Sequence, residues 1–428
     1  MIKKFSCKGF KNIVCKDLDF TKINILIGSN NAGKSNFIRA ISFAANIVSN
    51  PKTEKTGFLS ELKRNGWDAA ADKHSADKKF KLMWNFELAD NKPVNYTLQA
   101  QVGNNRADNY IVEESLDSTE LKEGREAPYN YFSCHKDILG KGQFSTAGMR
   151  KTKNNRIRTN VNQYESVLLQ MDNLFFESKE LFSTLFVRDE IRKVLKSMET
   201  YFNSFFAYSC TAFDLNAIRD LQDKQAEGDF LKKDGSNFVN VFSVAKSSDE
   251  GFHKRYIESL HRLSNQCEDV IIKEGNGKIW MEVQMDGIWY PLSEVSDGTV
   301  HLLLLLLLLN LPGKNSITNL EGNRHEISML AIDEPEMNLH PAWQKLLANE
   351  IMNGQSFTQC FISTHSPDFL DEFTEGFLSG KVNVFVFDKS SRIPIRKLDR
   401  GELMTELQEW TLGDLYRVGD AMIGGWPQ

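Results

Sequence analysis

A segment near the start of the chain combines glycine, lysine and serine at the spacing of a phosphate-binding loop. Residues 28–35, GSNNAGKS, fit the pattern G-x-x-x-x-G-K-[ST] between an apolar run and a stretch with helical spacing. The glycines let the backbone N–H groups point at phosphate oxygens, and the helix N-terminus adds positive potential. We therefore expect phosphate contacts from Gly28, Asn30, Asn31, Ala32, Gly33, Lys34, Ser35 and Asn36.

Two residues of this loop indicate a nucleoside triphosphate bound with Mg²⁺. The ammonium of Lys34 would reach the β- and γ-phosphates. The hydroxyl of Ser35 would ligate Mg²⁺, because a hard cation prefers oxygen ligands.

Two adjacent acids end an apolar run in the C-terminal part of the chain. The run SMLAIDE places Asp333 and Glu334 at the end of an expected strand. In P-loop enzymes an acid at this position helps to coordinate Mg²⁺. We expect Asp333 to hold Mg²⁺, directly or through water, and Glu334 to activate the attacking water as general base. The alternative is a pair of solvated acids at a strand end.

A histidine and a small-residue turn complete the residues with candidate chemistry. His365 follows another apolar run, QCFISTH, where an imidazole could sense the γ-phosphate, although a lone histidine is more often structural. The turn Ser296–Thr299 opens a leucine-rich helix, and its free N–H groups suit an anion. Ser296 or Thr299 could instead only cap that helix.

These four elements, in this order, resemble the ABC-type ATPase heads of the RecF, SMC and OLD group. The segment LSEVSDGT stands where that family has its signature loop, DEPEMNLHP resembles its Walker B motif and D-loop, and STHSPDFL resembles its switch-histidine segment. Asp297 replaces the first glycine of the common LSGGQ signature, which is familiar in the OLD-like branch. We cannot place the family's Q-loop glutamine.

The resemblance implies an ATPase that completes its active site by dimerising. Two ATP molecules would lie between two head-to-tail subunits, with Ser296, Asp297 and Gly298 of one subunit capping the nucleotide of the other. Glu334 and His365 would be the catalytic residues, and Ser35 and Asp333 the Mg²⁺ ligands. Lys11 and Asn12, in the run GFKN, resemble the family's segment beside the nucleotide.

Composition agrees with a globular protein. The chain has 428 residues, 41% hydrophobic and 25% charged, with a net charge of −5 that excludes a broad positive field for coating nucleic acid. Its six cysteines lack metal or disulfide spacing. No signal peptide or membrane span is expected, because the apolar run Leu302–Leu309 is too short to cross a bilayer. We expect a cytoplasmic protein.

Periodicity predicts an α/β fold: an ABC-type P-loop head, with a mixed central sheet and a flanking antiparallel sheet, that carries a helical insertion lobe. We assign 1–130 to the N-terminal half of the head, 131–270 to a basic loop and helical insertion, and 271–428 to the C-terminal half, ending in a turn-rich tail. The expected loop, about 131–160, is rich in basic residues: Lys136, Lys141, Arg150, Lys151, Lys153, Arg156 and Arg158.

The sequence is compatible with more than one biological function for such an ATPase. Stand-alone heads of the OLD-like branch often serve bacterial antiphage defence, which implies a sensor and scaffold ATPase that controls a separate nuclease or toxin. The alternative is a DNA repair ATPase of the RecF or SMC type, with residues 136–158 as the candidate DNA contact. We expect no Toprim nuclease domain, because only about forty residues follow Phe387. A GTPase is disfavoured because the run Asn91–Val94 lacks the base-reading aspartate.

Overall fold

The computed structural model describes residues 1–48, 57–88, 93–121, 127–136, 142–146, 159–177, 185–226, 228, 230–264, 266–311, 327–354, 357–388 and 394–424. The chain folds into two compact units, and each unit is made of segments that are separated in the sequence. The first comprises residues 1–20, 35–205 and 390–395, and the second residues 21–34, 206–389 and 396–428. The three-part division at residues 130 and 270 stays a prediction.

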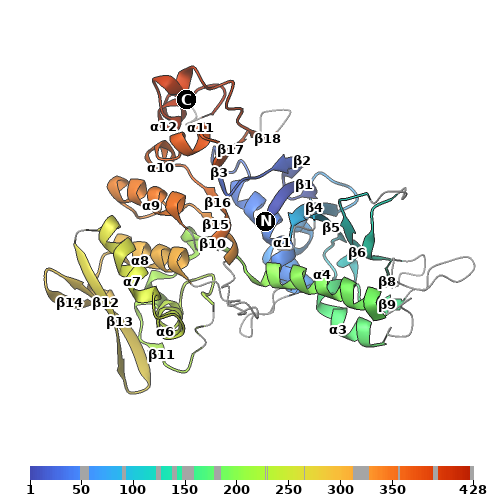
Figure 1. Ribbon diagram of the computed structural model, residues 1–428, viewed down its shortest axis with the longest axis horizontal. Coiled ribbons are helices and arrows are strands. Elements are labelled where there is room, and N and C mark those ends of the chain that lie inside the picture. Colours follow the sequence, from blue (N-terminus) through green and yellow to red (C-terminus); the bar gives the residue numbers. More distant parts are fainter. Residues whose placement is uncertain are drawn as a thin grey trace, which may run out of the picture. The chain divides into compact units, whose positions relative to one another are not determined.

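The first unit is built on an eight-stranded sheet whose neighbouring strands pair antiparallel (Figure 1). In spatial order the strands are β2 (Ile13–Asp19), β1 (Ile2–Phe10), β4 (Lys79–Glu87), β5 (Pro93–Gln101), β6 (Tyr110–Ser118), β7 (Asn130–Lys136), β8 (Gly142–Ser145) and β9 (Thr159–Val161). The flanking antiparallel sheet is therefore confirmed. The irregular loop expected over residues 131–160 was wrong for β7, β8 and β9, because their short alternating pattern was hidden among polar residues.

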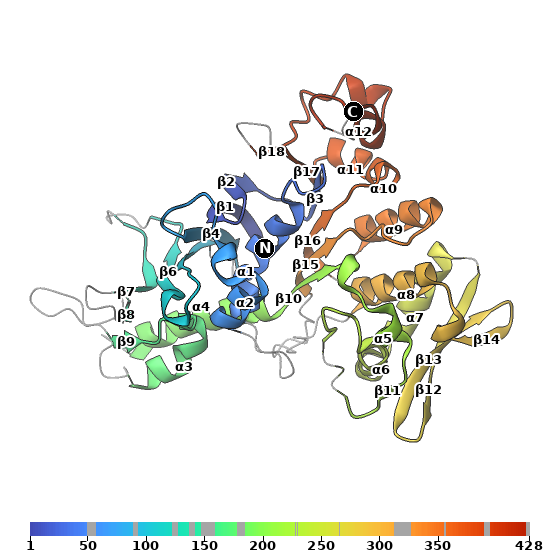
Figure 2. The ribbon, with the colours of Figure 1, turned by 180° about the vertical axis from the view of Figure 1, so that it is seen from behind.

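Helices cover one face of this sheet. Alternate residues of β4 are buried, and the Nε1 of Trp84 on that face donates to the Ile41 carbonyl of α1 (Lys34–Val48) at 3.0 Å. Phe86 on the same face meets Tyr201 of α4 (Leu185–Asn203), with ring centroids 5.1 Å apart. Figure 2 shows α3 (Val167–Glu177) beside α4 and β9. A short helix, α2 (Phe58–Arg64), completes the unit.

The second unit centres on a six-stranded sheet. Its spatial order is β10 (Phe205–Ser209), β15 (Ile327–Asp333), β16 (Phe357–Ser363), β3 (Ile23–Gly28), β17 (Val382–Phe387) and β18 (Ile395–Lys397). The strands β15, β16, β3 and β17 are parallel. For β15, β16 and β17 this was expected from their continuous apolar runs. The carboxyl ends of the four strands meet at one edge, where open α/β sheets bind ligands.

A smaller antiparallel sheet and several helices complete the second unit. The smaller sheet contains β11 (Gln222–Asp223), β12 (Cys267–Gly275), β13 (Lys278–Met285) and β14 (Ile288–Pro291). The helices are α5 (Leu215–Arg219), α6 (Phe238–Ser248), α7 (Phe252–Leu263), α8 (Asp297–Asn310), α9 (Pro341–Asn353), α10 (Pro367–Asp371), α11 (Thr374–Leu378) and α12 (Leu412–Val418).

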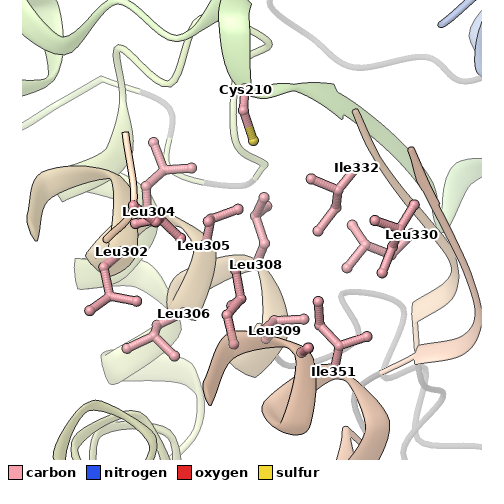
Figure 3. Close-up of a cluster of buried hydrophobic side chains, with 14 of the residues drawn as sticks. Cys210, Leu302, Leu304, Leu305, Leu306, Leu308, Leu309, Leu330, Ile332 and Ile351 are labelled. Carbon is pink, nitrogen blue, oxygen red and sulfur yellow. The ribbon is translucent and has the colours of Figure 1, made fainter. Parts of the chain in front are cut away.

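The core of the second unit surrounds the leucine-rich helix α8. Every residue of Leu302–Leu309 is buried, as expected for a helix that is apolar on all sides. Figure 3 shows Leu308 and Leu309 on the side of this helix toward Leu330 and Ile332 of β15 and Ile351 of α9. This packing fixes the turn before α8 on the unit that also carries the ends of β3, β15 and β16. No helix in the described ranges is long and apolar enough to cross a membrane.

Candidate nucleotide-binding site

The phosphate-loop segment begins where only glycine fits. Gly28 ends β3 with φ 140°, and a Cβ there would lie 2.3 Å from the carbonyl oxygen of Phe387 on β17. Gly33 has φ 116°, and Asn31 adopts the left-handed region at φ 61°. These conformations curl the backbone between β3 and α1, as the sequence pattern predicts.

The remaining loop residues differ in exposure. Asn30 and Asn31 are exposed, while Ala32 is buried and its N–H donates to the Ser29 carbonyl at 3.2 Å. The loop therefore holds its own shape and presents two amide side chains to solvent.

Lys34 points back into the loop. Its buried ammonium donates to the carbonyls of Gly28 at 2.9 Å and Ser29 at 3.2 Å, and its Nζ lies 2.7 Å from Nε2 of His365. Burial lowers the Lys34 pKa to about 8, although nearby carboxylates, Glu334 foremost, oppose that shift. The ammonium is thus held in a desolvated place by weak acceptors that a phosphate could replace.

The two acids after β15 lie beside the end of β16. Asp333 is buried and pairs in register with Ser363, whose hydroxyl donates to its carboxylate. Glu334 takes the left-handed conformation at φ 58°, and its N–H donates to the carbonyl of Ser363 at 3.1 Å. Burial and the neighbouring Asp333 raise the pKa of Glu334, while Lys34 lowers it.

His365 is a neutral imidazole in this site. Burial, and then the Lys34 charge, lower its pKa to about 4. A neutral ring next to an ammonium accepts at Nε2, so the ring proton is on Nδ1. The same Nε2 lies 3.5 Å from Oε1 of Glu334. The structure thereby brings together three of the residues predicted from sequence, with His365 in contact with both Lys34 and Glu334.

Glu336 belongs to this cluster and was missed by the sequence reasoning. One carboxylate oxygen accepts from the His365 N–H at 2.7 Å and from the Thr364 hydroxyl at 2.9 Å. The other oxygen, Oε2, is buried and has no hydrogen-bond partner among the described residues, and burial raises the Glu336 pKa. An acid two residues after the Asp-Glu pair was the available signal, but its partners lie 28 residues or more along the chain.

Gln344 joins the same two segments from α9. Its Nε2 donates to the Leu339 carbonyl at 2.9 Å, and its Oε1 accepts from the Ser366 hydroxyl at 2.5 Å. The segment after β15 and the segment after β16 are therefore tied together by side chains on both sides of His365.

The Ser296–Thr299 turn packs against the segment that follows Glu334. Ser296 caps α8, with its hydroxyl oxygen accepting from the Thr299 N–H at 3.2 Å, so the capping alternative is correct as a local description. A Cβ on Gly298 would lie 2.6 Å from the Asn338 carbonyl oxygen. Ser296 and Asp297 are exposed. The turn therefore caps a helix and also offers polar groups to solvent.

Four candidate residues belong to the first unit. Lys11 donates through Nζ to the carbonyls of Asn65 at 3.0 Å and Ala69 at 3.4 Å, and burial lowers its pKa. Asn36 donates through Nδ2 to Oδ1 of Asn12 at 2.7 Å. The fourth, Ser35, is half-buried in the first turn of α1. Their nucleotide contacts stay predictions, as do the roles of the other candidates.

The described part of the expected tail, up to residue 424, includes most of the helix α12. The helix α12 packs on α10, and Arg417 pairs with Asp368 at 2.6 Å and Asp371 at 2.9 Å. Tyr416 is buried and its hydroxyl donates to the Gly28 carbonyl at 3.4 Å. The turn-rich composition misled the sequence reasoning because α12 is only seven residues long.

Most of the basic segment from Lys136 to Arg158 lies outside the described residues. Residues 137–141 and 147–158 fall in these gaps, which include Lys141 and every arginine of the segment. Its candidate DNA contact therefore stays a prediction.

Solved structures similar to this chain include heads of SMC proteins. A crystal structure of an SMC head bound to the C-winged helix domain of ScpA is 14% identical, with a TM-score of 0.48 over 94% of this chain and 99% of that one. A Pyrococcus furiosus SMC head with an extended coiled coil is 12% identical, with a TM-score of 0.44 over 95% and 98%. The SMC head from Thermotoga maritima is 12% identical, with a TM-score of 0.42 over 93% and 99%.

A family model covers most of the chain. The model described as "AAA domain, putative AbiEii toxin, Type IV TA system" matches residues 23–371, a range that contains the phosphate loop, the α8 turn, the two acids and His365. No curated protein matches the chain. The match spans well over half of the 428 residues, so the chain belongs to this AAA-domain family of P-loop ATPases.

Proposed function

We propose that the chain hydrolyses ATP with Mg²⁺ and that two copies close around the nucleotide. The observation that carries the proposal is the contact of Lys34 with His365, and of His365 with Glu334, at the end of the parallel sheet. A phosphate-binding ammonium, a candidate base and a candidate sensor rarely meet by chance at the edge where such sheets bind ligands.

The chain's own groups suit a triphosphate. The loop N–H groups and the start of α1 supply positive potential, and Lys34 exchanges its contacts with the Gly28 and Ser29 carbonyls for phosphate oxygens. This exchange would also release Nε2 of His365, which could then accept from the attacking water or, as the Nε2–H tautomer, donate to the phosphate. Binding therefore rearranges the cluster that acts in hydrolysis.

The acids fit a divalent cation. Asp333 and Glu334 oppose a single buried ammonium, so the cluster carries more negative than positive charge. No group of three or more His, Cys, Asp or Glu side chains in the described ranges is arranged to hold a metal alone. Asp333 and Ser35 would supply two oxygen ligands. When bound, Mg²⁺ would stabilise charge on the transferring phosphoryl group.

Glu334 would take the proton of the attacking water. Its raised pKa makes the carboxylate a stronger base, while the charge of Lys34 limits that rise. His365, neutral at physiological pH, holds the water or the γ-phosphate by hydrogen bonding. Glu336 fixes the backbone that carries this imidazole.

The second copy supplies the α8 turn. Ser296 and Asp297 are exposed at a helix N-terminus, where free N–H groups and the helix dipole suit a phosphate. The resemblance to ABC-type heads supports placing this turn against the nucleotide of the other subunit.

Replacing Glu334 tests the proposal. Glu334→Gln removes the base and leaves Asp333, so ATP should still bind, turnover should stop, and an ATP-dependent dimer should accumulate in analytical ultracentrifugation. Glu402→Gln, an exposed acid of the same unit, is the matched control and should behave as wild type. Wild-type turnover in the Glu334→Gln protein would refute the assignment.

We further propose that dimer closure controls a separate effector in antiphage defence. The family description, which names a toxin of a type IV toxin–antitoxin system, supports a place in such systems. Bacteria carrying the chain and its neighbouring gene should resist phage, and Glu334→Gln should remove that resistance. Equal protection by both versions would contradict ATP control of the effector.

A further inference from the structure

The α8 turn carries a negative charge where the proposed function needs a phosphate. Asp297 is the first residue of α8, and 62% of its side chain is exposed. A carboxylate facing a triphosphate repels it, and this repulsion is strong wherever the approach excludes water. Glu294, exposed just before the turn, adds a second negative charge.

Arg219 holds that carboxylate from outside the turn. Its Nη2 donates to Oδ1 of Asp297 at 2.6 Å and to the Val295 carbonyl at 2.9 Å, and its Nε donates to the Leu292 carbonyl at 3.1 Å. Only 18% of the Arg219 side chain is exposed, so the guanidinium is fixed along its length. Arg219 is the last residue of α5 and lies 78 residues before Asp297 in the sequence.

The histidine of the same helix cannot perform this role. His301, one turn further along α8, is buried, and its two ring nitrogens have no hydrogen-bond partner in the part of the chain that the structure describes. Burial lowers its pKa to about 4, despite Asp297, so the ring is uncharged at neutral pH. It packs edge-on against Phe213, with centroids 5.5 Å apart. The charge of Asp297 is therefore balanced by Arg219 and not by His301.

We propose that Arg219 is a positioning residue that neutralises Asp297 and thereby lets the α8 turn accept the triphosphate bound by a second copy. This inference rests on the proposed function, because it requires the turn to act between subunits. Arg219 also fixes the carbonyls of Leu292 and Val295, so the exposed N–H groups of the turn keep one orientation. An acidic signature turn thus becomes compatible with an anionic ligand.

The ion pair contributes little to folding, which makes the test clean. Its acid is mostly exposed, and such pairs contribute little to stability. The test uses the Glu334→Gln protein with ATP and Mg²⁺, and compares Arg219→Gln, Asp297→Asn and the double variant. Lys224→Gln is the matched control, because Lys224 also pairs with an exposed acid, Glu274, at 2.5 Å in the same unit.

The expected result is a charge effect on assembly. Arg219→Gln should weaken the ATP-dependent dimer by about tenfold or more, and less so in high salt. Adding Asp297→Asn should restore most of the loss, because it removes the unbalanced charge. ATP binding to the monomer should not change, and Lys224→Gln should dimerise like its parent.

Two results would overturn the inference: Arg219→Gln dimerises like its parent, or Asp297→Asn fails to rescue it. The second result would mean that Arg219 only shapes the turn. If the Glu334→Gln parent itself forms no dimer with ATP, the proposed function fails, and this inference fails with it. That outcome is distinguishable because it appears before any change at Arg219.

Discussion

The buried ammonium of Lys34 predicts that ATP binding takes up a proton. Its pKa is lowered from 10.5 to about 8, chiefly by burial. A bound triphosphate would return this pKa to the ordinary range of lysine, because an adjacent anion favours the charged form. Above pH 8 the nucleotide-free protein has largely lost this proton, so ATP binding must recover it from solvent.

The lowered pKa sets the size of the effect. With a pKa near 8, about 0.8 proton should be taken up per ATP at pH 8.5, and ATP affinity should fall about 20-fold between pH 7.5 and 9.5. A lysine of ordinary pKa would take up almost none and change affinity by less than about 1.2-fold. The two cases are therefore easy to distinguish.

The same shift predicts how folding stability depends on pH. The folded protein binds the Lys34 proton less tightly than the unfolded chain, so the cost of the buried charge is fully present below pH 8. The cost, about 3 kcal/mol, should disappear as the pH rises toward 10.5. Stability of the nucleotide-free protein should therefore increase with pH through this window, relative to Lys34→Met.

Calorimetry measures the proton directly. ATP is titrated at pH 8.5 into the protein in two buffers of different ionisation enthalpy, and the difference in heat gives the protons exchanged. Burial raises the pKa of all six thiols, so they stay protonated at this pH. Lys34→Arg, which stays charged, should take up no proton. Uptake below about 0.2 proton by the wild type would refute the account of Lys34.

Three further substitutions test the geometry of the site. Gly28→Ala should abolish ATP binding and destabilise the protein by about 2 kcal/mol or more in thermal melts, because its Cβ would collide with the Phe387 carbonyl at a positive φ; an unchanged melt would contradict this. Glu336→Ala should lower kcat about tenfold or more with little change in ATP affinity, because the N–H of His365 loses its acceptor. Full turnover in this variant would exclude the positioning role. Glu336→Gln, the control, should retain most of the activity. Arg417→Ala should lower the melting temperature by a few degrees without changing ATP affinity, since it releases α12 from α10; a parallel loss of ATP binding would show a wider role.

Local patterns were sufficient for much of the fold. Continuous apolar runs predicted the parallel strands β15, β16 and β17, because a strand buried on both faces is apolar throughout. Alternation predicted β4, β5 and β6, because a strand buried on one face alternates apolar and polar residues. The uniformly apolar run of α8 predicted a buried helix for the same reason.

Contacts between distant segments were not predictable from those patterns. The sequence reasoning identified Lys34, Glu334 and His365 but missed Glu336 and Arg219, whose partners are set by the fold. It also took β7–β9 for a loop and α12 for a tail. Short elements carry too few residues to show a period, and tertiary packing then decides their conformation.

The central claim is that one active site is built from two copies of the chain, and mixing two inactive variants tests it most directly. Lys34→Ala disables the phosphate loop. Ser296→Asp keeps a residue that caps helices well but places a negative charge at the α8 turn. Ser296→Asn, a neutral cap, is the control and should remain active.

Each variant alone should hydrolyse no ATP, because every site in its dimer contains one defect. Mixed dimers contain one site with an intact loop and an intact turn, so the equimolar mixture should regain a substantial fraction of wild-type turnover. A mixture as inactive as its components would contradict a site completed in trans.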